Sequence, residues 1–400
     1  MRHWTRREML SSLVAGSAVL PGTGRSAAPS APNAPVALAR CRSYAPSELV
    51  PLLDRMFDQI GGLAGIVKGK TVAMKVNLTG SPTGRLGHSP LEETTWTHPA
   101  VIGATIHLMD RAGARRIRIL ESPWSTADPL EEIMFQAGWD PRDFLSAARL
   151  VEFENTNYLG QGKRYHRFAV PNGGHLFPAY DLNHSYEDCD VFVSSAKLKE
   201  HATAGITLAM KNCFGITPCT IYGDGAGVQE PSLLPVHGRG AVFHYGQRPP
   251  SLSSPQEKDP ASPRDGGYRV PRAVADLVAA RPIHLSIVDG IVSQAVGETA
   301  NSYNSFRVEP GVIMVGANPV CTDAVGAAVM GFDPMADRGQ IPFEHCDSTL
   351  RLAEELGVGT RDLSRIEVVG TPIREAVFDY RKAWRDHGLD GVRQIRRRRS

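Results

Sequence analysis

Short apolar runs rich in β-branched residues recur along the chain and alternate with segments of helical periodicity. Seven runs have the length of buried strands, and they cover residues 71–78, 116–121, 150–153, 190–195, 284–289, 311–316 and 365–370. Apolar residues follow helical spacing at 47–60, 98–112, 271–280, 319–330 and 346–356. Strands that alternate with helices predict an α/β fold, with a mostly parallel sheet and helices on both of its faces.

One segment, residues 218–268, breaks this alternation. It is rich in glycine, proline and serine, and it contains Tyr222–Gly227 and His237–Gly240 without any strand or helix period. Irregular segments of this length are usually lids or disordered insertions. Its glycines could cradle a phosphate, but no GxGxxG pattern follows a strand and opens a helix. We therefore expect a long, flexible loop insertion around 218–268.

The N-terminus has the pattern of an export signal. Residues 1–28 combine a basic start, a short apolar run over Met9–Leu20 and small residues at Ser26–Ala28. The adjacent pair Arg6-Arg7 resembles a twin-arginine signal, and an ordinary secretory signal or a basic tail is the alternative. We expect an exported protein, periplasmic or extracellular, that meets the twin-arginine translocation machinery. A Pro/Ala linker at 29–44, a domain at 45–372 and a C-terminal helix with a basic tail at 373–400 would follow.

The export signal yields a first testable prediction. Replacing Arg6 and Arg7 together with lysine is expected to leave the precursor in the cytoplasm, because the twin-arginine route reads the arginine pair itself. Fractionation of cells that produce the wild type and the double variant measures this directly. Unchanged export of the double-lysine protein would assign the signal to the general secretory route.

Charge and cysteine content narrow the classes of partner. The net charge is +2, but the basic ends hide a mildly acidic body, which is a poor match for nucleic acid. No run approaches the ~18 apolar residues of a membrane-spanning helix, so no stable span is expected in the mature form. The six cysteines form no C-x-x-C pair, so no iron–sulfur cluster is expected. Cys213 and Cys219 could form a disulfide, although separate buried thiols are favoured.

Polar residues gather where the predicted strands end. Open parallel sheets bind ligands at the carboxyl ends of their strands. Lys75 and Asn77 fall on one side of the first strand, while Val72, Met74, Val76 and Leu78 fall on the other. The later strands end at Glu121, at Lys197 and Lys199, at Asp289 and at Asn318. His98 and Asn318 each precede a proline, so both also suit helix N-caps.

Residues 197–215 carry the densest set of polar groups. Lys197, Lys199, His201 and Lys211 lie in surroundings of Ala, Gly, Ile, Leu and Met. The pattern predicts a helix over 203–214 that ends at Gly215, with Thr207 and Lys211 on one face. Cations that converge in apolar surroundings are costly unless an anion or a metal-bound group compensates them. An exposed basic helix start is the alternative.

The same segment resembles a known family. The pattern K-L-K-x-H-x5-T-x3-K-N-x-x-G at Lys197–Gly215 is similar to the signature of the DUF362 family, a domain of unknown function. The resemblance extends over about residues 70–370 through Lys75–Asn77, Thr97–Pro99, Ile287–Gly290 and Asn318–Val325. Many members carry a ferredoxin-type cysteine module, which this chain lacks. The resemblance implies a fold and motif positions, and it implies no settled reaction.

Four classes of function remain open from the sequence. The first is an exported enzyme for a small anionic substrate, a carboxylate or a phosphate, with a divalent metal or another cofactor as a possible aid. The others are a carrier that binds an anion or metal cofactor without chemistry, a metal-assisted racemase or isomerase of hydroxy acids, and a nucleic-acid binder that uses the Arg396–Arg399 tail.

The enzyme hypothesis assigns a role to each polar residue. His201 is the candidate general acid or base, and Lys199 or Lys211 could serve as a desolvated base. The candidate ligand-binding residues are Lys75, Asn77, His98, Lys197, Thr207, Asn212 and Asn318. The candidate metal ligands are Glu121, Asp289 and Asp323. We expect one cleft to bring together Lys75, His98, Glu121, Lys199, Lys211 and Asp289.

Overall fold

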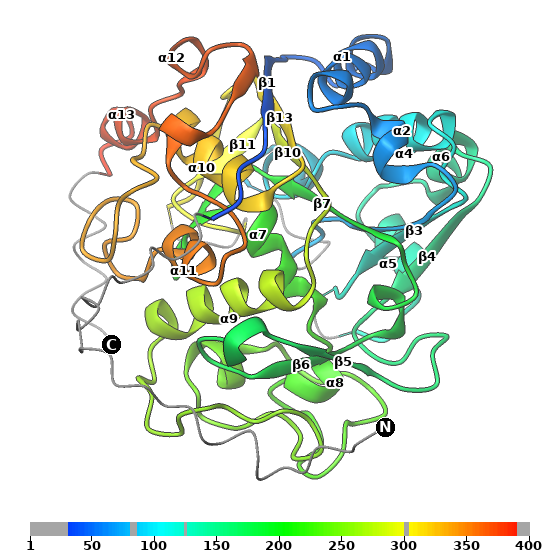
Figure 1. Ribbon diagram of the computed structural model, residues 1–400, viewed down its shortest axis with the longest axis vertical. Helices are drawn as coiled ribbons and strands as arrows, with labels where there is room; N and C mark the ends of the chain where they lie inside the picture. Colours follow the sequence, from blue (N-terminus) through cyan, green and yellow to red (C-terminus); the bar gives the residue numbers. More distant parts are fainter. Residues whose placement is uncertain (1–30, 81–85, 124–125, 300–303, 390–400) are drawn as a thin grey trace, which may run out of the picture. The chain divides into compact units, whose positions relative to one another are not determined.

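An eight-stranded mixed sheet forms the centre of the protein in the computed structural model, which describes residues 31–80, 86–123, 126–299 and 304–389 (Figure 1). The predicted signal and the basic tail lie outside these residues. The strands run in the order β14 (Val368–Gly370), β1 (Val36–Arg40), β13 (Val312–Gly316), β10 (Leu285–Gly290), β7 (Val191–Lys197), β2 (Thr71–Lys75), β3 (Arg116–Glu121) and β4 (Val151–Asn155). β13 is antiparallel to β1 and β10, and the other neighbours are parallel. The predicted α/β fold is confirmed, and all seven predicted strands are present.

The expectation of a linker at 29–44 is wrong over β1. Val36–Arg40 pairs with β13 on one side and β14 on the other. Val36, Ala37 and Leu38 are fully buried. A single five-residue strand among prolines and alanines gives too short a pattern to be recognised in the sequence.

Helices cover both faces of the sheet and form two apolar cores (Figure 1). The first core contains Val72 and Met74 of β2, and α1 (Pro46–Gln59), α2 (Leu63–Val67), α4 (Pro99–Arg111), α5 (Leu130–Gln136) and α6 (Pro141–Ala147) contribute to it. The second contains Ala73, and α9 (Gly266–Ala280), α10 (Pro319–Val329) and α11 (Thr349–Glu355) contribute to it. The predicted alternation along β2 is thus confirmed, and Lys75, two residues after Ala73, lies on the same face of the sheet as Ala73.

The predicted helix over 203–214 is a hairpin followed by a short helix. β8 (Lys199–His201) pairs with β9 (Gly205–Thr207), and then come α7 (Ala209–Asn212) and the 3-10 turn η3 (Cys213–Ile216). Gly205 has a φ of +72°, and a Cβ there would lie 2.6 Å from the Phe343 ring. This left-handed turn replaces the first helical turn that the spacing predicts.

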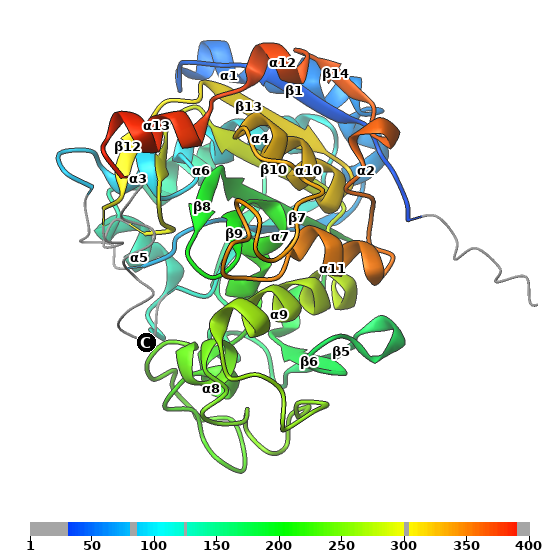
Figure 2. The same cartoon turned by 90° about the vertical axis from the view of Figure 1, so that its left-hand side faces the viewer.

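The segment 218–268 is packed against the body, which corrects the expectation of a flexible loop. It contains α8 (Cys219–Tyr222) and a π-helical turn, η4 (Gly240–His244), and lies below α9 in Figure 2. Val242 and Phe243 of η4 are fully buried, and the Phe243 ring packs edge-on against Phe177 and Phe214. These apolar residues lie too far apart to form a periodic pattern.

The remaining elements are short. Two-stranded sheets pair β5 (His166–Ala169) with β6 (Ala179–Leu182) and β11 (Ser293–Ala295) with β12 (Phe306–Val308), and α3 (Leu91–Thr94) precedes α4. The predicted C-terminal helix is two helices, α12 (Ile373–Ala376) and α13 (Tyr380–Asp386), with Tyr380 and Trp384 buried. Among the described residues, no helix combines the length and apolar character needed to cross a membrane.

Candidate functional site

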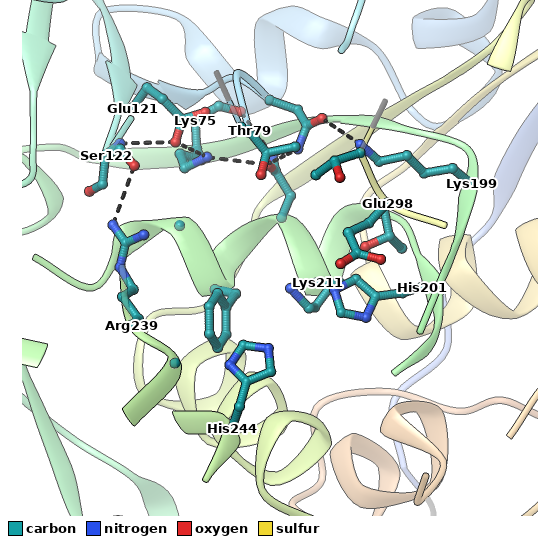
Figure 3. A pocket seen from close by; sticks show the side chains of 18 of the residues that line it. Lys75, Thr79, Glu121, Ser122, Lys199, His201, Lys211, Arg239, His244 and Glu298 are labelled. Atoms are coloured by element: carbon teal, nitrogen blue, oxygen red, sulfur yellow. Dashed lines mark hydrogen bonds and ion pairs between the residues drawn. The ribbon is translucent and has the colours of Figure 1, made fainter. Parts of the chain in front are cut away.

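A cavity of about 300 Å³ lies at the C-terminal ends of β2 and β3, beside the segment that follows β7 (Figure 3). Its walls come from five parts of the chain that are distant in sequence. They are the end of β2 with Lys75 and Asn77, the end of β3 with Glu121, the segment from β8 to η3, the η4 turn, and the stretch after β11. A cavity of this size accommodates one small organic molecule.

A buried ion pair, Lys75–Glu121, forms one wall of the cavity. The Lys75 ammonium lies 2.6 Å from the Glu121 carboxylate, and both side chains are almost fully buried. Glu121 also accepts hydrogen bonds from the backbone N–H groups of Leu78 and Ser122. Burial lowers the pKa of Lys75, and the Glu121 carboxylate opposes this shift. Gly215 allows this contact, because a Cβ there would lie 3.0 Å from the Lys75 Nζ.

The Asn212 side chain connects the wall to the sheet. Its Nδ2 donates to Ser194 Oγ and to the carbonyls of Lys75 and Ser195, and its Oδ1 accepts from Lys75 Nζ and Asn77 Nδ2. Asn77 Oδ1 in turn accepts from Lys199 Nζ at 3.3 Å. Lys199 also donates to the Thr95 carbonyl, and burial lowers its pKa well below the usual range. These bonds fix both amides and Lys199 before any ligand arrives.

Lys211, on α7, presents its ammonium to the cavity. It lies 4.1 Å from the centre of the Phe214 ring, and no hydrogen bond or ion pair joins it to another described residue. Burial is the main cause that lowers the pKa of Lys211 to about 8, and the Glu298 carboxylate opposes the shift. An ammonium that contacts only a ring face among the described residues retains its hydrogen-bond donors for a ligand.

Arg239, the residue before η4, provides a second cation to the cavity. It donates from Nε to the Thr217 carbonyl at 2.6 Å, and from Nη2 to Asn157 Oδ1 at 2.9 Å and to the Ser122 carbonyl at 3.3 Å. No described residue accepts from its Nη1. The guanidinium is therefore held in place with donor capacity remaining.

Two histidines and one carboxylate complete the cavity, and Figure 3 shows Lys211 between Glu298 and His244. His201 Nδ1 accepts from the Thr203 N–H at 3.1 Å, and burial lowers the pKa of His201 to about 3. Burial likewise lowers the pKa of His244 to about 4. Burial raises the pKa of Glu298, but nearby His201 and Lys211 outweigh it and lower this pKa to about 2. At neutral pH the imidazoles are therefore neutral and Glu298 is ionised.

A family model described as "Domain of unknown function (DUF362)" matches residues 72–328, which is more than half of the chain. The chain belongs to the DUF362 family. The matched region contains every lining residue named above, so the cavity lies within the DUF362 domain.

The individual relatives are distant. The thylakoid-associated protein sll1697 of Synechocystis is 27% identical over 185 residues, and the match spans 46% of this chain and half of that protein. A structural-genomics protein from Thermotoga maritima is 13% identical with a TM-score of 0.34, covering 69% of this chain and 56% of that one. The lactate racemase apoprotein of Thermoanaerobacterium thermosaccharolyticum is 12% identical with a TM-score of 0.33, covering 69% and 54%. None of these likenesses indicates the reaction of this DUF362 protein.

The DUF362 signature at 197–215 divides between the cavity and a separate buried cluster. Lys199, His201, Thr207, Lys211, Asn212 and Gly215 line the cavity. Lys197 does not, because its ammonium lies 2.7 Å from the fully buried Asp289 carboxylate. The spacing of Lys197 and Lys199 predicts that both side chains face the same way. They do not, because the chain leaves the main sheet at Leu198 and forms β8.

His98 and Asp289 belong to this second cluster, which corrects the expectation that they share the cleft. Asp289 accepts from the Tyr44 hydroxyl at 3.0 Å and from the His98 N–H at 3.0 Å. His98 Nδ1 accepts from the Ala100 N–H and caps α4, and its ring stacks on Tyr44 at 3.7 Å. The N-cap role that the sequence offered for His98 is confirmed.

Asn318 lies at the opposite end of the sheet from the predicted edge because β13 is antiparallel to β10, and Asp323 is not among the residues that line the cavity. The C-terminal end of β13 pairs with the first residues of β10, at Gly316 and Ser286. Asn318 therefore caps α10 by accepting from Val320 and Cys321 N–H groups. Asp323 accepts from the Ala209 and Met210 N–H groups at the start of α7, and burial raises its pKa to about 7.

The three predicted metal ligands thus lie in three separate places, each occupied by protein donors. Within the described ranges, no three His, Cys, Asp or Glu side chains come together as a metal site. The three carboxylates predicted as metal ligands therefore do not form a joint metal site. The separate buried thiols favoured for Cys213 and Cys219 are confirmed, because both side chains are buried and no disulfide joins them.

Three charged or imidazole side chains of the cavity were not predicted from the sequence, namely Arg239, His244 and Glu298. Arg239 belongs to the glycine-rich stretch 237–240, but glycine-rich stretches occur in many loops and do not by themselves indicate a binding site. His244 and Glu298 lie in irregular stretches, where no strand or helix period indicates which side chains point inward.

Proposed function

We propose that this DUF362 protein is an enzyme that binds a small carboxylate or phosphate in the cavity, with Lys211 and Arg239 as its anion-binding groups. The observation that carries this proposal is the Lys211 ammonium, which faces the cavity without a hydrogen bond or ion pair to a described residue. A buried cation of this kind is stabilised by an anionic ligand that brings its own acceptors.

The charges of the cavity support an anion. Lys75 and Glu121 neutralise each other, and both histidines are neutral at pH 7. Lys199, Lys211 and Arg239 then face a single carboxylate, Glu298, so basic side chains are in excess in the cavity. A dianion such as a phosphate ester, or a carboxylate with one more polar group, would be complementary to these groups.

Catalysis is proposed over simple binding because a group that titrates near neutrality lies in the cavity. The pKa of Lys211, about 8, suits a general base or nucleophile better than the pKa of His201, about 3. We therefore no longer assign His201 the role of general acid or base, and propose that its neutral imidazole orients a ligand. A carrier without chemistry is the second candidate, and export through the twin-arginine route remains part of the proposal.

A ligand screen tests this function. A panel of small carboxylates and phosphate esters at pH 7 is expected to include compounds that raise the melting temperature, by roughly 5 °C at 100 times the dissociation constant. The rise should be lost in Lys211→Met and kept in Lys382→Met, because Lys382 is a surface lysine on α13. NMR of the recovered ligand separates an enzyme, which changes it, from a carrier. A panel without any stabilising anion, or an equal rise in Lys211→Met, would contradict the proposal.

A further inference from the structure

The three lysines of the cavity differ in what holds them. Lys75 is paired with Glu121 at 2.6 Å, and Lys199 donates to Asn77 and to the Thr95 carbonyl. Lys211 has neither kind of partner among the described residues, and it lies over the Phe214 ring. Its nitrogen can therefore approach a ligand atom without breaking an existing bond.

The surroundings of Lys211 also favour a neutral amine. Burial, with the positive charges of Arg239 and Lys75, lowers its pKa to about 8 although the Glu298 carboxylate opposes the shift. At pH 8 about half of the Lys211 side chains then carry a free lone pair, roughly a hundredfold more than for an ordinary lysine with a pKa near 10.4. A desolvated lysine beside other cations is an activated nucleophile toward carbonyl groups.

We infer that Lys211 forms an imine with its substrate, and that the substrate is a small carboxylate or phosphate carrying an aldehyde or ketone group. This inference rests on the proposed function, because the anionic group of the substrate would be bound by Arg239 and the neighbouring donors. It adds the class of the reacting group, which anion binding alone leaves open.

The step balances without an oxidant or reductant. The Lys211 lone pair attacks the carbonyl carbon, the π pair moves to the oxygen, and one proton passes from nitrogen to that oxygen. The carbon–oxygen bond of this carbinolamine then breaks, and its hydroxyl leaves with a second nitrogen proton as water, so that a carbon–nitrogen double bond remains. His244 is a suitable proton carrier, since its buried Nδ1 has no hydrogen-bond partner in the described chain.

Reductive trapping tests the inference on the full chain. Wild-type protein is incubated at pH 8 with glyoxylate or pyruvate and sodium cyanoborohydride, which reduces an imine to a stable secondary amine. We expect one adduct per chain, mapped to Lys211 and formed at least tenfold faster than at any surface lysine. Excess acetate, an anion without an aldehyde or ketone, should slow it.

Lys211→Arg is the decisive variant, because it keeps the positive charge and cannot form the imine. It should lose the specific adduct and still bind acetate, whereas Lys382→Arg should retain the adduct. Acetate binding by the wild type without preferential labelling of Lys211 would overturn the imine and leave the proposed function standing. Absence of both anion binding and labelling would contradict both.

Discussion

Replacing Lys197 with methionine is expected to destabilise the folded protein by about 3–5 kcal/mol, because it leaves a buried carboxylate without its cation. Lys197 and Asp289 are both fully buried, and their charged atoms lie 2.7 Å apart. The Tyr44 hydroxyl and the His98 N–H would still donate to Asp289, but they bring no positive charge. Burial lowers the pKa of Lys197 despite the adjacent carboxylate, which shows how strongly this site disfavours a single charge.

Urea unfolding of matched variants measures this effect. Lys197→Met with Asp289→Asn should recover part of the loss, since the double variant buries no unpaired charge. Lys211→Met should be as stable as the wild type or more stable, because it removes a buried cation that has no ion pair among the described residues. Equal losses of unfolding free energy in Lys197→Met and Lys211→Met would show that both lysines have a structural role.

The sheet was predictable because its strands carry strong local signals. Alternation along β2 correctly placed Lys75 on the side opposite Val72 and Met74, and four of the six residues expected in one cleft do line it. These four are Lys75, Glu121, Lys199 and Lys211. The strand ends concentrate polar side chains at one edge, which is a consequence of parallel pairing alone.

The errors arise where the direction of the chain depends on tertiary contacts. Asn318 follows a strand, but β13 runs antiparallel to β10, and an apolar run of five residues carries no sign of its direction. Lys197 and Lys199 diverge because β8 pairs with β9 and leaves the main sheet. Arg239 and His244 reach the cavity through the packing of Val242 and Phe243, which no periodic pattern announces.

The affinity for an anion should also depend on pH in a way that identifies Lys211. A bound anion favours the ammonium, so binding is strongest below the pKa of the free protein, about 8. Above this pH, the affinity should fall by about tenfold per unit until it reaches the higher pKa of the complex. His201 and His244, with pKa values of about 3 and 4, and Glu298, at about 2, do not titrate in this range. Asp323, with a pKa of about 7, and Lys199, whose pKa is lowered by burial, are also present near α7, so the comparison with Lys211→Arg is what isolates the contribution of Lys211.

Calorimetric titration of one carboxylate ligand from pH 6 to pH 10 is the most direct test of anion binding by this cavity. A carboxylate does not change its own charge over that range, so the slope reports the protein. We expect nearly constant affinity up to pH 7.5 and a decline above pH 8 in the wild type, and an almost flat profile in Lys211→Arg. A flat profile in the wild type, or the same decline in Lys211→Arg, would contradict the role of Lys211 as the charged anion-binding group.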